Sequence, residues 1–283
     1  MRKYFLTLAA TLLAASSVNA VVMTNGSLVV DITNSNGAID AVVFQGNDFY
    51  NPGSPVSDFG LQIGTDTGSF RFNTTTGFDG IGMAVTGSTA TSVTASGTYL
   101  GQVNVTRVYE LVAGLNVLKV STTLEAITGV SNLRLFDTAD PNQGSGSATF
   151  NDRRTLAGGT VLQAAGSFNT DTTIWGFVTD RGGFSGGFGL GINTGLELNA
   201  FFSSGGFDPN GGFSDIVMAI GNEFSLSAGQ SVTVSYAQAY GDNVLEAENE
   251  FLAYASSAAV PEPTSLGIWA IGLVGVGFAR RRR

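Results

Sequence analysis

Apolar and polar side chains alternate regularly between residues 103 and 125, with one short interruption at Ala113-Gly114. A period of two is that of a half-buried β-strand, because successive side chains of a strand point to opposite faces of its sheet. Two such runs joined by a short glycine turn predict a β-hairpin. The residues expected on its buried face are Val103, Val105, Tyr109, Leu111, Leu118, Val120, Thr122 and Leu124.

Runs of the same kind recur along the chain and predict an all-β fold. The chain contains 39 glycines and only 12% of its residues are charged, a composition that suits strands joined by tight turns. We therefore expect one large antiparallel β-sandwich, with a division into two β domains near Ala139–Thr149 as the alternative. Further strands are predicted at Ser27–Ile32, Ala38–Gln45, Phe59–Gly64, Thr91–Tyr99, Ser131–Asp137, Thr160–Phe168, Thr172–Thr179, Leu196–Phe202 and Ser231–Tyr240.

One helix is predicted, directly before the C-terminal tail. Asn243 followed three residues later by Glu246 has the spacing of a capping box. Apolar residues then recur at helical spacing, so we expect a C-terminal helix that covers the sheet and leads the chain out, or else acts as a stalk. They are Val244, Ala247, Phe251 and Tyr254.

The charge of the chain is concentrated between its two ends. Residues 21–259 contain 7 basic and 21 acidic residues, a formal charge of −14, whereas the whole chain carries −9. Such a body should repel nucleic acid and anionic lipid, so no nucleic-acid partner is expected. Cys and His are both absent, which excludes thiolate nucleophiles, Ser-His-Asp triads and His-ligated zinc. We expect neither catalytic residues nor a resident cofactor.

Two near copies of one short motif could bind a cation. The stretches DPNQG (140–144) and DPNGG (208–212) have the composition of tight turns. The alternative is a Ca²⁺ site, because this cation takes oxygen ligands from carboxylates and amides. Its candidate ligands are Asp137, Asp140, Asn142, Asp208 and Asn210.

Trp175 is the only tryptophan between residues 21 and 259. A lone Trp on a strand usually belongs to a core, and a sugar-stacking platform is the alternative, so Trp175 is the candidate ligand-binding residue. Glu110 and Glu125 lie on predicted strands and would serve glycoside hydrolysis only if they were about 5–10 Å apart. Solvated or salt-bridged carboxylates are the default interpretation.

Both ends of the chain have the pattern of targeting segments. Residues 1–20 combine a basic start, an apolar stretch and the small-residue site Val18-Asn19-Ala20, which predicts a secretory signal peptide cut by signal peptidase after Ala20. Thr264–Ala279 is an uncharged run of sixteen residues, short of the about twenty that span a bilayer, and four arginines follow it. These arginines should stay cytoplasmic, which places the body on the far side of the inner membrane. The expected divisions are a signal peptide (1–20), a β-sandwich body (21–241), a helix and linker (242–259) and a sorting signal with a short transmembrane segment (260–283).

The C-terminal tail resembles the PEP-CTERM protein-sorting signal. Pro261-Glu262-Pro263, the apolar run and the final arginines occur in the order of that signal. The resemblance implies export by a Gram-negative bacterium, transient anchoring in the inner membrane, and processing by an exosortase, a membrane transpeptidase-like enzyme. It implies a recognition element of Pro261, Glu262 and Pro263 and a retention clamp of Arg280, Arg281, Arg282 and Arg283. Proteins with this signal are associated with exopolysaccharide and biofilm matrix.

The start of the body shows a second resemblance. The stretch NGSLVVDITNSNGAIDAVVFQGNDFYNPG (25–53) is similar to the opening strands of β-supersandwich domains of the galactose mutarotase type. Mutarotase activity in that family uses histidines, which this chain lacks, so the resemblance implies the fold without the activity.

These observations favour a non-catalytic protein of the cell surface or extracellular matrix, sorted by an exosortase. A carbohydrate-binding module is the alternative, supported by Trp175 and by the implied matrix location. A carboxylate-based glycosidase or lyase is a third hypothesis, which would require two acids facing one cleft.

Overall fold

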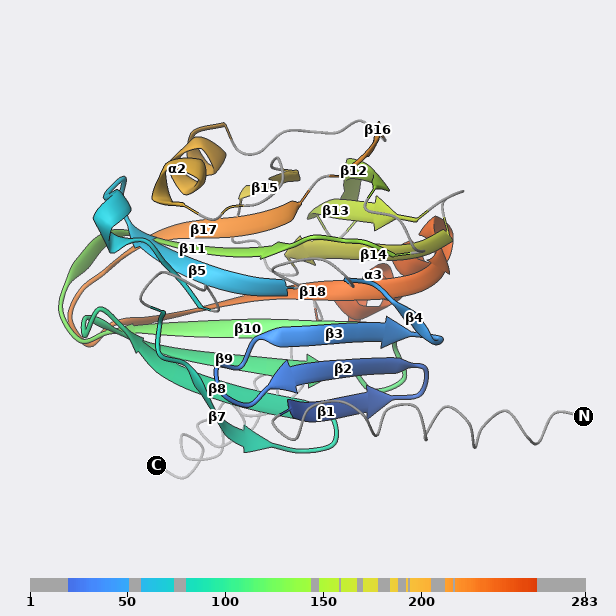
Figure 1. Cartoon of the computed structure of the whole chain (residues 1–283), viewed down its shortest axis with the longest axis horizontal. Helices are drawn as coiled ribbons and strands as arrows, with labels where there is room; N and C mark the ends of the chain where they lie inside the picture. The colour runs from blue at the N-terminus through green and yellow to red at the C-terminus, as the bar shows by residue number, and fades with distance from the viewer. Residues whose placement is uncertain are drawn as a thin grey trace, which may run out of the picture.

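The strands form two antiparallel sheets that face each other across an apolar interior (Figure 1). The computed structural model describes residues 20–50, 57–73, 80–143, 148–157, 159–166, 170–177, 184–187, 192, 194–204, 212–215 and 217–258. Within these residues each sheet has nine strands. The predicted antiparallel β-sandwich is therefore confirmed.

The first sheet, sheet A, has the order β1-β2-β3-β5-β11-β17-β15, with β4 paired to β3 and β6 paired to β5. Its strands are β1 (Ala20–Asn25), β2 (Leu28–Thr33), β3 (Ile39–Phe44), β4 (Asn47–Asp48), β5 (Ser57–Ile63), β6 (Arg71–Phe72), β11 (Val130–Ala139), β15 (Phe184–Gly187) and β17 (Met218–Leu226). A short 3₁₀ turn, η2 (Thr67–Ser69), precedes β6.

The second sheet, sheet B, has the order β16-β12-β13-β14-β18-β10-β9-β8-β7. Its strands are β7 (Ala84–Ser88), β8 (Ser92–Tyr99), β9 (Val103–Leu111), β10 (Val117–Ala126), β12 (Thr149–Leu156), β13 (Gly159–Ala165), β14 (Thr170–Phe177), β16 (Gly212–Ser214) and β18 (Ser231–Asn243). The predicted hairpin is β9–β10, in which Tyr109 lies opposite Val120 and Val103 opposite Ala126. Its apolar face is buried between the sheets, as the alternation predicted.

One predicted strand is wrong. The segment predicted as a strand at Leu196–Phe202 lies within the helix α2 (Gly195–Ser204). A reciprocal capping box starts this helix: Glu197 N–H donates to Thr194 Oγ1 at 3.2 Å, and Thr194 N–H donates to Glu197 Oε2 at 2.9 Å. Leu198, Phe201 and Phe202 then share one helical face that packs on the outer side of sheet A. The helical spacing of these apolar residues outweighed their strand propensity.

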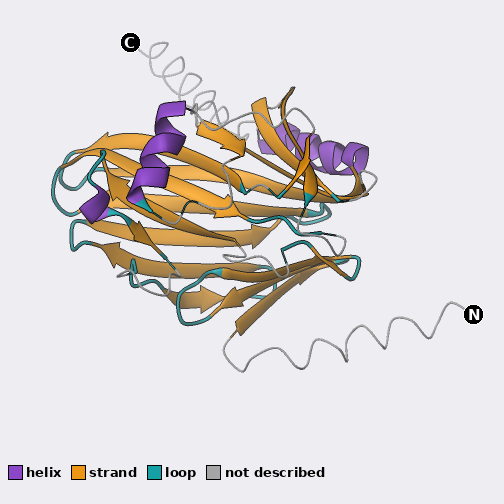
Figure 2. Cartoon of the chain, turned by 45° about the horizontal axis from the view of Figure 1, so that its top comes forward, coloured by secondary structure: helices purple, strands orange, loops and turns teal. Residues whose placement is uncertain are grey.

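The predicted C-terminal helix is α3 (Val244–Ala258), and it covers part of the outer face of sheet B. Glu246 N–H donates to Asn243 Oδ1 at 3.1 Å, which confirms the predicted cap. Figure 2 shows α2 and α3 as two separate helices flanking the strands. No helix among the described residues is long and apolar enough to cross a membrane.

A glycine makes the close packing of α3 on the sheet feasible. Phe251 of α3 rests on Gly176 of β14, where an added Cβ would lie 2.6 Å from the ring carbon Cζ of Phe251 and 2.7 Å from Val161 Cγ1. Real Cβ atoms do not approach carbon atoms so closely, so a larger residue must push the helix away.

We predict that Gly176→Ala lowers the free energy of unfolding by about 1–3 kcal/mol, because an extra methyl overpacks the contact between α3 and β14. The measurement is urea denaturation of the purified body. Gly87→Ala is the matched control, since a Cβ at Gly87 meets no atom within 4 Å. Equal stability of the two variants would contradict the tight contact.

Candidate functional site

A buried ion pair joins the two sheets at the middle of the sandwich. Arg107 projects inward from β9 of sheet B, and Asp137 projects inward from β11 of sheet A. Arg107 Nη2 contacts Asp137 Oδ1, and both side chains are almost fully buried. The pair is therefore a direct polar connection between two sheets whose shared interior is mainly apolar.

Further contacts satisfy the guanidinium of Arg107. Its Nε donates to the hydroxyl of Tyr109 at 2.8 Å, and its Nη1 donates to Thr122 Oγ1 at 2.9 Å. The guanidinium also lies over the ring of Phe59, 4.5 Å from its centroid. Burial is the largest single effect and alone would lower the pKa of Arg107, but Asp137, Tyr109 and Tyr236 together outweigh it and raise the pKa well above its ordinary value. The guanidinium therefore stays charged.

Hydrogen bonds continue from Asp137 along the inner face of β18. Tyr236 donates its hydroxyl to Asp137 Oδ1 at 3.1 Å, and Gln238 Nε2 donates to the same tyrosine oxygen at 3.1 Å. The amide oxygen of Gln238 accepts a short hydrogen bond of 2.5 Å from the hydroxyl of Tyr240. Residues 236, 238 and 240 alternate along the strand, so all three side chains point into the interior.

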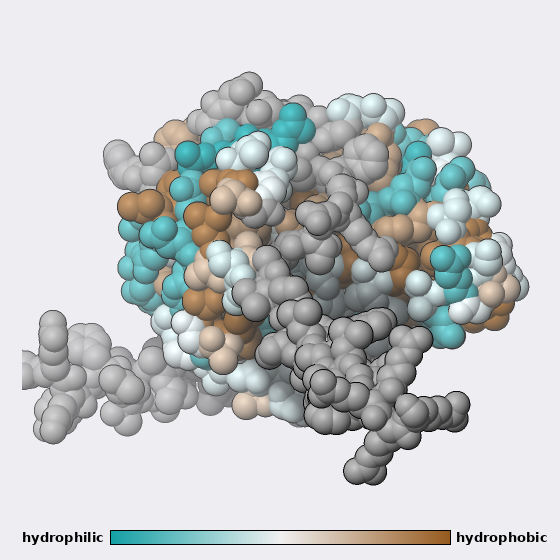
Figure 3. Space-filling model, turned by 180° about the vertical axis from the view of Figure 1, so that it is seen from behind, coloured by the Kyte–Doolittle hydropathy of each residue, from teal (hydrophilic) through white to brown (hydrophobic). Residues whose placement is uncertain are grey.

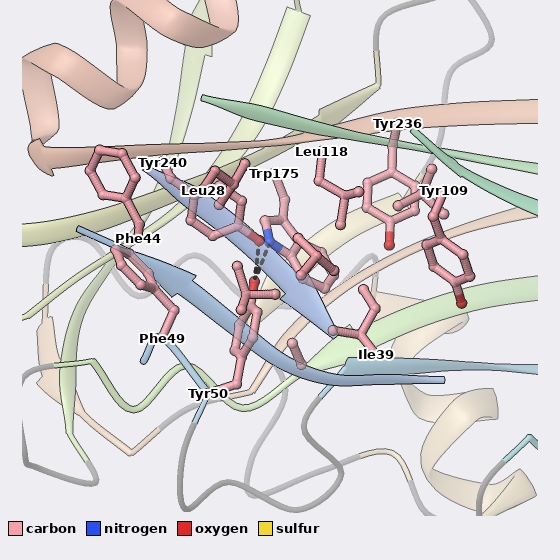
Figure 4. Packing of buried hydrophobic residues seen from close by; sticks show 14 of the residues in the cluster. Leu28, Ile39, Phe44, Phe49, Tyr50, Tyr109, Leu118, Trp175, Tyr236 and Tyr240 are labelled. Atoms are coloured by element: carbon pink, nitrogen blue, oxygen red, sulfur yellow. Dashed lines mark hydrogen bonds between the residues drawn. The ribbon is translucent and has the colours of Figure 1, made fainter. Parts of the chain in front are cut away.

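From Tyr240 the polar contacts continue to Tyr50 and Trp175 (Figure 4). The indole N–H of Trp175 donates to the hydroxyl of Tyr50 at 3.1 Å, and the hydroxyls of Tyr50 and Tyr240 lie 3.3 Å apart. Burial raises the pKa of Tyr50 to about 12 and that of Tyr240 well above its usual range. These hydroxyls therefore remain protonated at neutral pH and act as hydrogen-bond donors. We call the whole set the buried polar chain: Arg107, Asp137, Tyr236, Gln238, Tyr240, Tyr50 and Trp175.

A small cavity lies beside this chain. Asp137, Tyr236 and Thr122 line it together with Phe177 and Asn222. Its free space is close to that of one water molecule, which is far too little for a sugar ring. In the described structure the buried polar chain thus holds charges and protons in fixed positions between the sheets.

Trp175, the candidate ligand-binding residue, is fully buried and packs against Tyr236 with the ring centroids 5.4 Å apart. The ring is already in contact with protein, so a sugar could stack on it only after the sandwich had opened. Ligand binding at Trp175 stays a prediction.

The candidate Ca²⁺ ligands are spread over different surroundings. Asp137 faces Arg107 in the interior, whereas Asp140 lies beyond the end of β11. Burial raises the pKa of Asp140, and the nearby charge of Asp215 raises it further. Asp208 and Asn210 lie outside the described residues, and within the described residues no group of three acidic side chains could hold a metal ion. The calcium site remains a prediction.

The two candidate acids of a glycosidase lie on the outer face of sheet B. Glu110 forms an ion pair with Lys119 at 3.2 Å, and Glu125 accepts a hydrogen bond from Asn104 at 3.4 Å. Glu125 lies opposite Asn104 in the hairpin. Asn104 precedes Glu110 by six residues on β9, so the two acids are roughly 20 Å apart along the strands. That separation exceeds what a catalytic carboxylate pair requires.

The residues of the predicted targeting segments lie mostly outside the described part of the chain. Ala20, the predicted cleavage residue, is the first residue of β1. Pro261, Glu262, Pro263 and the four terminal arginines lie beyond Ala258, the last described residue.

The ion pair itself was missed from the sequence, although one signal was available. Arg107 occupies a position of the same alternation that buries Val105 and Tyr109, so the pattern placed a charge on an apolar face. A charge there requires a buried partner. Nothing in the sequence indicates that Asp137 is that partner.

We predict that breaking the ion pair is costly. Asp137→Leu alone should lower the free energy of unfolding by about 3–5 kcal/mol, because it leaves the charge of Arg107 buried without its counter-ion. The double variant Arg107→Met/Asp137→Leu should recover part of that loss. Denaturant unfolding measures the free energy of unfolding of both variants. Glu110→Gln, which removes the exposed pair with Lys119, is the control and should cost less than about 1 kcal/mol. A double variant less stable than Asp137→Leu would contradict this account.

We also predict a loss of stability at alkaline pH. The folded state raises the pKa of Tyr50 from its unfolded value of 10.0 to about 12, so its stabilising effect is complete below pH 10 and is lost as the pH rises to about 12. The loss due to Tyr50 should be of the order of 2–3 kcal/mol. Between these pH values, the measured free energy of unfolding should fall less steeply with pH for Tyr50→Phe than for the unsubstituted protein. An unchanged slope in that variant would remove Tyr50 as a cause.

The comparisons with known proteins concern the tail and the body separately. The model of the PEP-CTERM protein-sorting motif matches residues 259–283. No curated protein matches the sequence significantly.

The fold of the body is similar to that of a provisionally assigned aldose 1-epimerase from Escherichia coli K12, with a TM-score of 0.52, 10% identity, and coverage of 79% of this chain and 99% of that one. It is also similar to part of a bacterial glucoamylase solved with acarbose, with a TM-score of 0.58, 14% identity, and coverage of 84% of this chain and 34% of that one. The chain therefore carries a PEP-CTERM sorting motif, which implies export and exosortase processing, behind a body whose structural neighbours are galactose mutarotase-like folds.

Proposed function

We propose that this protein is a non-catalytic component of the cell surface or of an exopolysaccharide-containing extracellular matrix, delivered there by exosortase processing. The observation that carries the proposal is the position of the sorting motif. It begins at residue 259, directly after α3, the helix that completes the folded body. A motif in this place delivers the whole sandwich as one exported unit.

The chemistry of the body supports the non-catalytic part of the proposal. The charged and hydroxyl groups of the buried polar chain are engaged with one another and are buried from solvent. Glu110 and Glu125 are too far apart to act together on a glycosidic bond. The similarity to the aldose 1-epimerase and the glucoamylase extends to the fold alone, since identity is 10% and 14%.

The formal charge of −14 on residues 21–259 supports an extracellular location. A strong net charge of one sign keeps a protein soluble and suppresses association with anionic surfaces. A body of this kind can cross the periplasm without adhering to the inner membrane, once its tail has been removed.

We predict that the protein recovered from native cells and their surroundings begins at Val21 and ends close to Val260. The expected mass follows from removal of both targeting segments, and intact-mass analysis measures it. Mass in excess of that chain would identify a covalent glycan or lipid-like anchor. An uncut C-terminus would contradict exosortase processing. Turnover of a polysaccharide by the purified body would contradict the non-catalytic part alone.

A further inference from the structure

The helix α3 holds the C-terminal end of the body in a fixed place on sheet B. The carboxylate of Glu250 accepts hydrogen bonds from the backbone N–H of Asn116 at 3.0 Å and from its side-chain amide at 3.1 Å. Glu248 pairs with Arg154 of β12, and Phe251 packs on Gly176. The last described residue, Ala258, is thus held on the outer side of this sheet.

Only a short piece of chain separates this helix from the apolar tail. Five residues, Ala259 to Pro263, lie between Ala258 and Thr264, where the uncharged run starts. Even fully extended, such a piece reaches about 20 Å. While the tail holds the precursor in the membrane, the bilayer must therefore lie close to the end of α3. The short connection therefore keeps the end of α3, on the outer side of sheet B, within about 20 Å of the lipid.

The outer face of sheet B next to the end of α3 is rich in hydroxyl groups. Tyr254, in the last turn but one of the helix, is close enough to Glu110 for that charge to add to the burial that raises the pKa of Tyr254. Beyond Glu110 and Lys119, one row of hydroxyls crosses four neighbouring strands in register, and a second pair lies beside it. We call this surface the hydroxyl face, and its members are Ser96, Thr106, Thr123 and Thr233 with Ser121 and Ser235.

The hydroxyl face is ordered and carries little charge. The hydroxyls of Thr123 and Thr233 lie 2.8 Å apart, as do those of Ser121 and Ser235. One O–H of each pair donates to the other oxygen, which leaves the second O–H free to donate outward. The neighbouring charges are the Glu110–Lys119 pair and Glu125. Among the described residues, none of the exposed large hydrophobic side chains belongs to this face.

These properties match the surface of lipid headgroups. Anionic phospholipids repel an acidic body, so the orientation of least repulsion turns a charge-poor face towards them. Phosphate and ester oxygens accept hydrogen bonds from hydroxyl groups, and the apolar side chain on this face, Val108 opposite Ser121, is only partly exposed. The view of the molecule from behind shows hydrophilic and hydrophobic residues interspersed over the visible surface (Figure 3).

We propose that the hydroxyl face is the surface that the body turns towards the phospholipid headgroups while the sorting tail anchors the precursor. This inference rests on the membrane-anchored precursor of the proposed function. It assigns a partner surface to a part of the sandwich for which neither the sorting motif nor the fold specifies a role.

The test uses the full chain, purified uncut and reconstituted into nanodiscs of phosphatidylcholine and phosphatidylglycerol. The chain contains no cysteine, so single-cysteine variants accept one spin label each. Thr123→Cys places the label on the hydroxyl face, and Ala200→Cys places it on an exposed position of α2, which covers sheet A. Ni²⁺ bound to a nickel-chelating lipid should increase the spin-relaxation rate of the label at residue 123 several-fold more than that of the label at residue 200.

Two outcomes distinguish this inference from the proposed function. If the precursor inserts but the two labels relax equally, or residue 200 relaxes more, the orientation is wrong and the anchored precursor stands. If the precursor does not associate with the nanodiscs at all, the hypothesis of an anchored precursor is wrong, and this inference is wrong with it. Phe251→Ala, which loosens α3, should reduce the difference between the labels without releasing the chain from the lipid. An undiminished difference would overturn the role of the docked helix.

Discussion

The ion pair between Arg107 and Asp137 is the interaction on which the arrangement of the two sheets depends. Apolar contacts are non-directional, whereas a buried guanidinium that stays protonated requires a counter-ion within hydrogen-bonding distance. Because the pair connects β9 to β11, it selects one alignment of sheet B over sheet A. The hydroxyls of Tyr109 and Tyr236 then complete the hydrogen bonding of the two charges. Because apolar replacement of a buried pair is often neutral for stability, we infer that this pair contributes mainly to a single well-defined packing.

Local patterns allowed much of the fold to be predicted. The alternation of residues 103–125 gave the central hairpin, and the Asn243–Glu246 spacing gave the start of α3. Both features depend on residues only a few positions apart, so a single sequence contains all that is needed. The same kind of signal was present at Thr194 and Glu197 and was overlooked. There Leu196, Leu198 and Phe202 alternate as in a strand, whereas Leu198, Phe201 and Phe202 have helical spacing, and the cap favours the helix.

The candidate site could not be predicted in the same way, because its members are distant in the chain. The hydroxyl of Tyr50 lies 3.4 Å from the amide oxygen of Gln238, 188 residues later. No pattern within one strand specifies its partner across a sandwich. The sequence indicated only which positions point inward, and hence that Arg107, Tyr236 and Gln238 would each need a polar partner. The identities of the partners followed from the topology, which places β11 and β18 on opposite sides of the interior.

The two predicted processing sites lie at the limits of the described part of the sandwich, and this has a consequence for its stability. Cleavage after Ala20 would remove one residue from β1, which among the described residues is the edge strand of sheet A beside β2. Cleavage near Val260 would leave α3 whole, with Phe251 and Glu250 still in contact with sheet B. Among the described residues, the buried members of the apolar clusters lie between Met23 and Ala255, and the buried polar chain lies between Tyr50 and Tyr240. We therefore infer that the core within the described residues stays intact in the released body, because its buried members all lie between the two predicted cleavage sites.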